Sequence, residues 1–433
     1  MTPRLYLRLT ILILIASFCA LLPLHLRGES VRYSVVFDLT QSSRFGAENL
    51  LSGHKLIFSL QEKILPPSFT EENTALKKSG GIAYRLAKAV ILDNVASHFT
   101  YLGQHEVFGH GARYREFGYQ DIRYEINLFF PWGSGRGWTH GGGVPPDRWV
   151  SRHELMMAAT GGMEANSVLA RRLRINWMLR GQMTYDESML YLYSANDLLA
   201  YIWRTRWKIR GLKGNDITNW LNRLNYFEGY LFKEDYPLTL NDLCRHSWAN
   251  LISPFNYFAL YSLFVPYLWH GEIHSGIPII RIGKFKYLPS LRIGLTPYGT
   301  EFIQENYIKK GKQLHVASLR IGESTFHQFW GIGWECLNLL DRKHFCLDNR
   351  IDFWKQPELM LGKEEGYISQ SGWGGSAVLT GHLKNIKPLG IGVLLELGYK
   401  TAGFLEGEPM QKGIVFRIGL TYWEQTEFLR SHL

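Results

Sequence analysis

The sequence predicts an α+β protein, with a mainly helical region over residues 31–272 and an antiparallel β region over residues 273–433. Two observations predict this class. Apolar residues recur at helical spacing between Gly81 and Trp269, whereas after Glu272 they alternate with polar residues at a period of two. The composition, 46% hydrophobic and only 20% charged, indicates a folded chain, and 433 residues are enough for two domains with their own cores.

The first 30 residues predict an export signal. Arg4 and Arg8 precede the apolar run from Ile11 to Leu24, and small residues follow, so we expect cleavage after Ser30. An uncleaved anchor is the alternative, because the apolar stretch nearly reaches spanning length. Either reading predicts a protein of the cell envelope, at the outer membrane or in the periplasm.

The net charge of +10 raises the question of nucleic acid, but the basic residues are scattered along the chain rather than clustered. The sequence also contains no phosphate loop and no dinucleotide fingerprint. A basic chain with 14% aromatic residues suits contact with an anionic membrane surface. We therefore expect a membrane as partner and no nucleic acid.

The residues before the first long helix predict two strands, Val31 to Leu39 and Lys55 to Leu60, followed by a polar, proline-containing loop from Glu62 to Lys78. From Gly81 onward the apolar spacing becomes helical. This helix leads directly into the stretch that carries the most chemistry.

That stretch offers two imidazoles and one carboxylate, at His105, Glu106 and His110. Neutral imidazole is a favoured zinc ligand, and a neighbouring carboxylate can take a proton from a metal-bound water. Positions five apart on a regular α-helix diverge by about 140°, so both imidazoles reach one ion only if the helix contains an i→i+5 bulge. Gly109 and Gly111 make such a bulge cheaper. The alternative is a helix end with two structural histidines.

The best candidate for a third zinc ligand is Glu164. Apolar spacing from Leu155 to Val168 predicts a second helix, and a carboxylate on its glycine-lined apolar face is costly unless it is paired or metal-bound. The alternative is an ordinary ion pair with one of the nearby arginines, Arg113, Arg171 or Arg172.

These residues resemble the glutamate-zincin metallopeptidases. The pattern His105-Glu106-x-x-Gly109-His110 is similar to the motif of the dipeptidyl-peptidase III family, and Glu164-Ala165-x-Ser167 is similar to the third-ligand helix of thermolysin-like enzymes. The resemblance implies a zincin-like helical region, zinc bound by His105, His110 and Glu164, and a water activated by Glu106. It is confined to residues 104–167, and Val168 stands where thermolysin-like enzymes have an aspartate behind the first ligand.

Residues 118–151 form an aromatic and glycine-rich stretch, which predicts a loop lining the site. Within it, His140 is a second catalytic candidate, because an imidazole there could stabilise a developing oxyanion or orient substrate. A surface histidine is the alternative. The aromatic residues could equally hold the loop at a membrane interface.

Residues 152–270 predict further helices, and Leu251 to Trp269 contains no charged residue. That run is long enough to span a bilayer. Pro254 and Pro266 favour a buried helix hairpin or an interfacial segment at least equally.

The β region predicts an antiparallel meander of eight to ten strands. In the run from Phe416 to Tyr422, apolar residues take one face while Arg417, Gly419 and Thr421 take the other. Such alternation suits a membrane β-barrel, with lipid outside and water within, or a soluble sheet packed on the helices. The recurrent aromatic residues and the export signal favour the barrel.

Cys336 and Cys346 flank a short polar segment of this region. They predict either a disulfide in an oxidising compartment or two unpaired thiols in the sheet. The sequence leaves both alternatives open.

Three classes of function are consistent with these patterns. The first is an exported, membrane-associated zinc hydrolase, most simply a metallopeptidase that cleaves a peptide or another amide or ester. The second is a non-enzymatic outer-membrane barrel acting as a channel or scaffold. The third, an intramembrane metallopeptidase, ranks last because charged residues interrupt nearly every long apolar helix.

Overall fold

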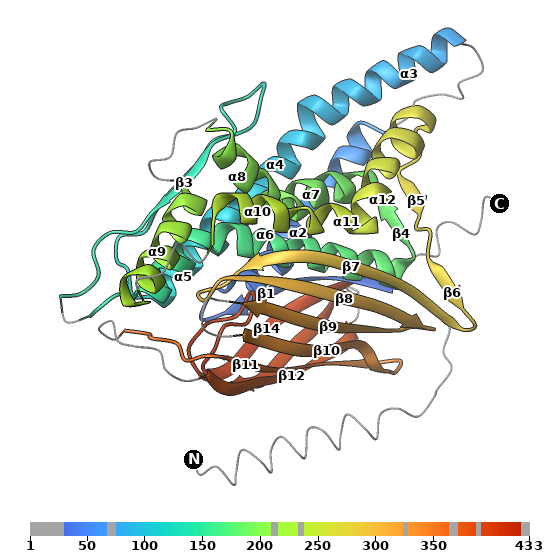
Figure 1. The fold of residues 1–433 in the computed structure, drawn as a ribbon. Coiled ribbons are helices and arrows are strands. Elements are labelled where there is room, and N and C mark those ends of the chain that lie inside the picture. Colours follow the sequence, from blue (N-terminus) through green and yellow to red (C-terminus); the bar gives the residue numbers. More distant parts are fainter. Residues whose placement is uncertain are drawn as a thin grey trace.

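The structure, a computed structural model, describes residues 30–66, 75–146, 148–208, 215–232, 238–323, 328–362, 371–386 and 391–425. Helices form one layer and a large curved sheet forms the other, as Figure 1 shows. The predicted α+β class is confirmed. The predicted signal peptide, residues 1–30, lies outside the described residues except for Ser30.

The helical layer contains α-helices and three π-helical segments, labelled η. In chain order they are α2 (Ser43–Ile64), α3 (Ala75–Lys88), η1 (Ala89–Asp93), α4 (Asn94–His105), η2 (Glu106–His110), α5 (Gly111–Glu116), α6 (Arg152–Arg180), α7 (Tyr185–Ala195), α8 (Asp197–Arg206), α9 (Asp216–Phe232), α10 (Leu240–Ser247), α11 (Ala249–Ile252), α12 (Pro254–Ser262) and η3 (Leu263–His270).

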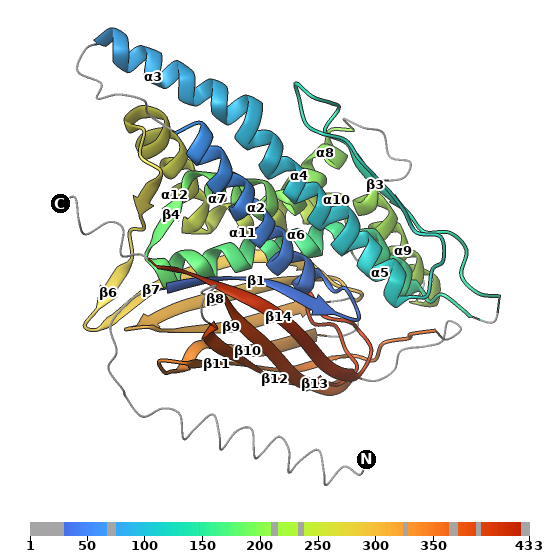
Figure 2. The same ribbon diagram turned by 180° about the vertical axis from the view of Figure 1, so that it is seen from behind.

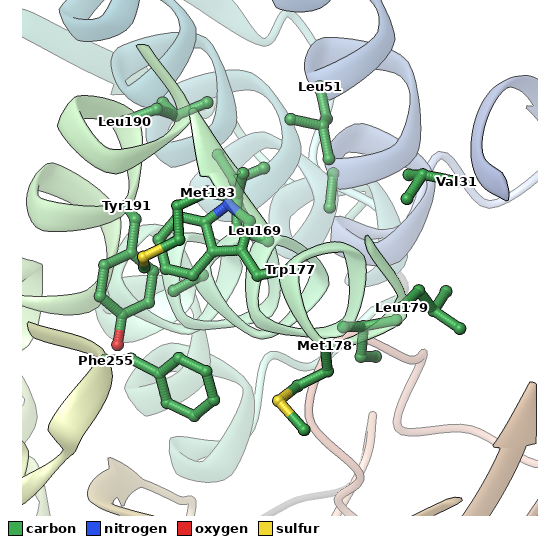
Figure 3. Packing of buried hydrophobic residues seen from close by; sticks show 14 of the residues in the cluster. Val31, Leu51, Leu169, Trp177, Met178, Leu179, Met183, Leu190, Tyr191 and Phe255 are labelled. Carbon is green, nitrogen blue, oxygen red and sulfur yellow. The ribbon is translucent and has the colours of Figure 1, made fainter. Parts of the chain in front are cut away.

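Helix α6 is the central element of this layer. It begins at a capping box between Ser151 and Glu154 and ends at Gly181, whose left-handed backbone conformation terminates it. Figure 3 shows its Trp177 packed with Tyr191 of α7 and Phe255 of α12. The same cluster reaches β1 and α2, so α6 joins the helices to the sheet.

The large sheet has ten antiparallel strands. In spatial order they are β1 (Ser30–Asp38), β14 (Gly413–Gln425), β13 (Ile391–Lys400), β12 (Ser371–Ile386), β11 (Phe345–Pro357), β10 (Gln328–Asp341), β9 (Gln313–Glu323), β8 (Thr300–Lys310), β7 (Phe285–Leu295) and β6 (Ile280–Ile282). Two small hairpins pair β2 (Arg123–Ile126) with β3 (Gly137–His140) and β4 (Gln182–Thr184) with β5 (His274–Gly276). The predicted antiparallel meander is confirmed, and β1 joins it from the N-terminal region beside β14 (Figure 2).

The closure predicted for a barrel is wrong for the described strands, because β1 and β6 end the sheet and do not pair with each other. Helix α2 occupies the free edge of β1. The Asn49 side chain accepts from the Val36 N–H at 2.6 Å and donates to the Val36 carbonyl at 3.0 Å, and Ser52 donates to the Ser34 carbonyl at 2.8 Å. These side chains satisfy backbone groups that a closing strand would otherwise pair.

The strand predicted from Lys55 to Leu60 is also wrong, because these residues lie inside α2. Helix α2 begins at the N-cap Ser42 and buries Ala47, Leu51 and Phe58, which recur at the helical period. The helical spacing of this longer stretch outweighs the local β propensity of six residues.

No single described helix is long and apolar enough to cross a bilayer. The bent pair Leu240–Ile252 and Pro254–His270, with an angle of 60° at the break, passes by length and composition when taken together. The predicted candidate Leu251 to Trp269 falls within this pair, and Ser253 separates its two parts.

The two sheet cysteines are free thiols in this structure. Cys336 lies on β10 and Cys346 on β11, and both are buried. The Cys346 thiol donates to the Asn338 side-chain oxygen at 3.1 Å. Of the two alternatives left open above, the structure has the unpaired thiols.

Candidate metal centre

The predicted i→i+5 bulge is confirmed between His105 and His110. His105 is the last residue of α4, and η2 follows as a π-helical turn in which the Gly111 N–H donates to the Glu106 carbonyl. The two imidazole Nε2 atoms lie 3.2 Å apart. Neighbouring nitrogen ligands on a tetrahedral zinc ion are separated by about 3.3 Å. The bulge therefore brings both histidines within reach of one ion.

Glycines let α6 pack directly against this bulge. A Cβ on Gly109 would lie 2.5 Å from the Gly162 Cα, and a Cβ on Gly162 would lie 2.4 Å from the His105 ring. The space opposite the His105 ring therefore accepts only glycine. Close packing of helices, rather than backbone freedom alone, explains these glycines.

Gly162→Ala is therefore expected to displace the His105 imidazole. The added methyl group overpacks a buried contact, so we expect a loss of stability of about 1–3 kcal/mol and weaker metal binding. Gly53→Ala in α2 is the matched control, because nothing lies within 4 Å of a Cβ there and the residue is exposed. Thermal unfolding and zinc content measure both effects. A Gly162→Ala protein as stable and zinc-rich as the control would contradict this packing.

Both histidines are oriented by acceptors at Nδ1. His105 Nδ1 lies 2.9 Å from the Asp197 carboxylate, and His110 Nδ1 donates to the Ala158 carbonyl at 2.7 Å. Because both partners accept, each neutral imidazole carries its proton on Nδ1 and its lone pair on Nε2. Without a cation the two Nε2 atoms share a hydrogen bond across 3.2 Å, whereas with both rings neutral their Nε2 lone pairs would be free to bind one ion.

Asp216 offers a third candidate ligand atom. Its carboxylate and the two imidazoles offer ligand atoms that all lie within 4.8 Å of one another, and its Oδ2 is 3.7 Å from His110 Nε2. Burial, together with the neighbouring Glu106 and Asp197, raises the pKa of Asp216, although His110 and His105 act in the opposite direction. A bound cation would relieve this crowding of carboxylates.

Asp197 forms the layer behind His105. Its carboxylate accepts from the Tyr101 hydroxyl at 2.6 Å and from the Asn166 amide at 2.8 Å. Burial lowers the pKa of His105, but Asp197, together with Glu106 and Asp216, outweighs burial and raises that pKa to about 9. An aspartate therefore does lie behind the first histidine, but it comes from α8 and not from the position of Val168.

Glu106 is buried under the hairpin of β2 and β3. The Thr139 hydroxyl lies 2.7 Å from Glu106 Oε2 and 2.9 Å from the Glu106 carbonyl oxygen. A Cβ on Gly137 would meet the Glu106 side chain at 2.8 Å. The glycine-rich stretch thus lines the site, as predicted, and Thr139 fixes one carboxylate oxygen.

The structure does not bring Glu164 to the imidazoles. Arg113 donates to it twice, from Nη2 at 2.5 Å and from Nε at 3.0 Å, and the Gly407 N–H donates to it at 2.8 Å. Both carboxylate oxygens are thereby engaged. Glu164 therefore forms the ion pair with Arg113 that was the alternative, and the carboxylate that lies near both imidazoles is that of Asp216.

His140 also lies apart from the group. It is exposed at the end of β3, with its ring beside Trp138 at a centroid distance of 6.4 Å. His140 is therefore a surface histidine, which was the alternative prediction, because the strand turns residue 140 outward and Thr139 inward. Tyr201, which the sequence did not single out, stacks on the His105 ring and places its hydroxyl 3.3 Å from His105 Nε2.

Comparisons of the chain with models of protein families, with curated proteins and with solved structures find no match. The zincin-like character of the helical region therefore stays a prediction based on a motif. The assignment of the site depends on the geometry of its own residues.

Proposed function

We propose that this protein is a zinc-dependent hydrolase. Its metal ligands are His105, His110 and Asp216, and its general base is Glu106. The observation that supports it most is the pair of Nε2 atoms 3.2 Å apart on a π-helical turn, with a carboxylate beside them. Two imidazoles and one carboxylate form a donor set typical of catalytic zinc, which keeps one position for water or substrate.

The charge of the site supports a divalent cation. Three carboxylates lie around the two imidazoles, those of buried Glu106 and Asp197 and of partly exposed Asp216. Excess buried negative charge is costly unless a cation compensates it. Zinc fits the nitrogen-rich donor set better than magnesium or calcium, which prefer oxygen ligands.

Each residue has a separate task in the proposed reaction. The metal, when bound, polarises a water molecule and the carbonyl of the substrate. Glu106 takes a proton from the water as its oxygen bonds to the carbonyl carbon, and passes that proton to the leaving group as the bond from the carbonyl carbon to that group breaks. Thr139 holds Glu106 Oε2, and Asp197 keeps the proton of His105 on Nδ1. The Tyr201 hydroxyl is placed to donate to the negative charge that develops on the carbonyl oxygen.

A peptide is the proposed substrate, with other amides and esters compatible with the same chemistry. The resemblance to zincin metallopeptidases favours a peptide. The hairpin also supports it, because among the described strands β3 pairs only with β2. Its other edge could pair with an extended peptide beside Glu106. The predicted export signal favours a site of action in the cell envelope.

Metal analysis tests this proposal. We expect the purified protein to carry one equivalent of zinc by plasma mass spectrometry, and His110→Ala and Asp216→Ala to lose most of it. Glu358→Ala, which removes an exposed carboxylate, is the control and should keep the metal. Full zinc in Asp216→Ala would contradict the ligand assignment. A zinc-free wild-type protein that conducts ions in a bilayer would support the channel instead.

A further inference from the structure

The face of the large sheet turned away from α6, here called the outer face, is apolar. On β14 the side chains of Ile414, Phe416, Ile418 and Leu420 are 46% to 73% exposed, while Arg417 between them is buried. The pattern continues sideways, because Leu395 of β13 and Phe37 of β1 flank Ile418 in register and are exposed as well. We infer that this outer face lies in the hydrocarbon of a lipid bilayer.

The opposite face of the sheet carries the charges. Arg417 forms ion pairs with Glu396, with Glu408 at 2.6 Å and with Asp38 at 2.9 Å. Other sheet carboxylates pair with helix α6, whose Arg171 lies 2.9 Å from Glu305 and 2.7 Å from Glu335. A sheet in water normally buries its apolar face and exposes its polar face. The polarity here is the reverse, as hydrocarbon outside the sheet requires.

The dimensions of the strands fit a bilayer. Strands β12, β13 and β14 contain 16, 10 and 13 residues. A tilted strand needs about 9–11 residues to cross the hydrocarbon core. At one end of the sheet the rings of Trp330, Phe353 and Trp373 cluster, and exposed Tyr422 lies toward the other end. Aromatic residues at both ends are typical of strands that meet two membrane interfaces.

The edge of β1 that no described strand pairs is covered by side chains of α2 and α6, so its backbone groups are satisfied without water. Asn49 bonds the N–H and the carbonyl of Val36, and Ser52 donates to the Ser34 carbonyl. Arg172 donates to the Arg32 carbonyl at 3.2 Å. Backbone groups that face hydrocarbon must find partners within the protein.

A second copy of the chain suits the outer face less well than lipid. The sheet curves around the helices, so its outer face is convex (Figures 1 and 2). A rigid partner would contact only part of a convex face, whereas acyl chains follow its whole surface. The proposal therefore commits to lipid, and it does not depend on the proposed hydrolase.

The test uses full-length protein reconstituted into phosphatidylcholine vesicles. A fluorophore is attached at Ile418→Cys or Leu397→Cys on the outer face, and at Arg245→Cys, an exposed polar control site on α10. The native cysteines of the described residues are buried, and unmodified protein measures their background labelling. Phosphatidylcholine with brominated acyl chains should quench the label at residues 397 and 418 strongly and leave residue 245 unaffected, while iodide should do the reverse.

Two outcomes would overturn the inference. Quenching by iodide at residues 397 and 418 as strong as at residue 245 would mean that water covers the outer face. Protection from both quenchers, together with cross-linking between chains at residue 418, would assign the face to a second copy. The two labelled positions lie on different strands, so a folding defect in one variant leaves the other to decide.

Discussion

Glu106→Gln is expected to lower hydrolytic turnover by about 10²–10⁴-fold, the usual contribution of a general base. The amide keeps the size of the side chain and can still pair with Thr139, whose hydroxyl lies 2.7 Å from Oε2. It cannot take a proton from water. Because Glu106 is not one of the three proposed ligands, zinc should remain at one equivalent. A fluorogenic peptide library, read beside metal analysis, measures both quantities on the same preparation.

The control for this variant is Glu358→Gln, which changes an exposed carboxylate outside the site and should leave turnover unchanged. A Glu106→Gln protein that keeps zinc and cleaves at the parental rate would contradict the role of Glu106. Loss of zinc in this variant would instead give Glu106 a part in binding the metal. Circular dichroism shows whether the variant is folded, and so distinguishes both results from misfolding.

The local part of the site was predictable from the sequence. Two histidines five apart with glycine between them require a bulged turn if they share one ion, and η2 has that geometry. The information lies within six consecutive residues, so no knowledge of the rest of the fold is needed.

The distant part of the site was not predictable, because it depends on how helices pack. Asp216 opens α9, where an acidic residue is ordinary because it stabilises the helix N-terminus. Asp197 comes from α8 and offers no spacing signal relative to His105. Glu164 lies on α6 as predicted, but Arg113 of α5, rather than an imidazole, meets its carboxylate.

The fold, like the site, has a part that is predictable from local sequence and a part that depends on packing. The period-two alternation after Glu272 predicted antiparallel strands, because side chains on a strand alternate between faces whatever lies beside it. Whether such a sheet closes into a barrel is not encoded in that alternation. Here the sheet of described strands stays open, and Asn49 and Ser52 of α2 occupy the edge of β1. Lys55 to Leu60 of the same helix predict a strand when read alone, because these residues suit either element.

Glu164→Gln is expected to destabilise the protein by about 3 kcal/mol without changing its zinc content. Removing one partner of a buried ion pair leaves the other charge buried, at a cost of roughly 3–5 kcal/mol. Arg113 and Glu164 are both nearly inaccessible, but Arg113 keeps Glu116 at 2.6 Å, which favours the lower end of that range. Denaturant unfolding in detergent measures the change, with Glu358→Gln as the control for a carboxylate outside the pair.

The same variant separates the two roles that the sequence left open for Glu164. If Glu164 serves only the ion pair, the two variants should give opposite results. Glu164→Gln should lose stability but keep its zinc. Asp216→Asn should lose zinc but keep nearly parental stability in the metal-free state. If Glu164→Gln loses zinc while unfolding at the parental denaturant concentration, the carboxylate reaches the metal in the folded protein. Asp216 would then have to give up its place, because two imidazoles and one carboxylate already leave a tetrahedral ion only one position for water or substrate.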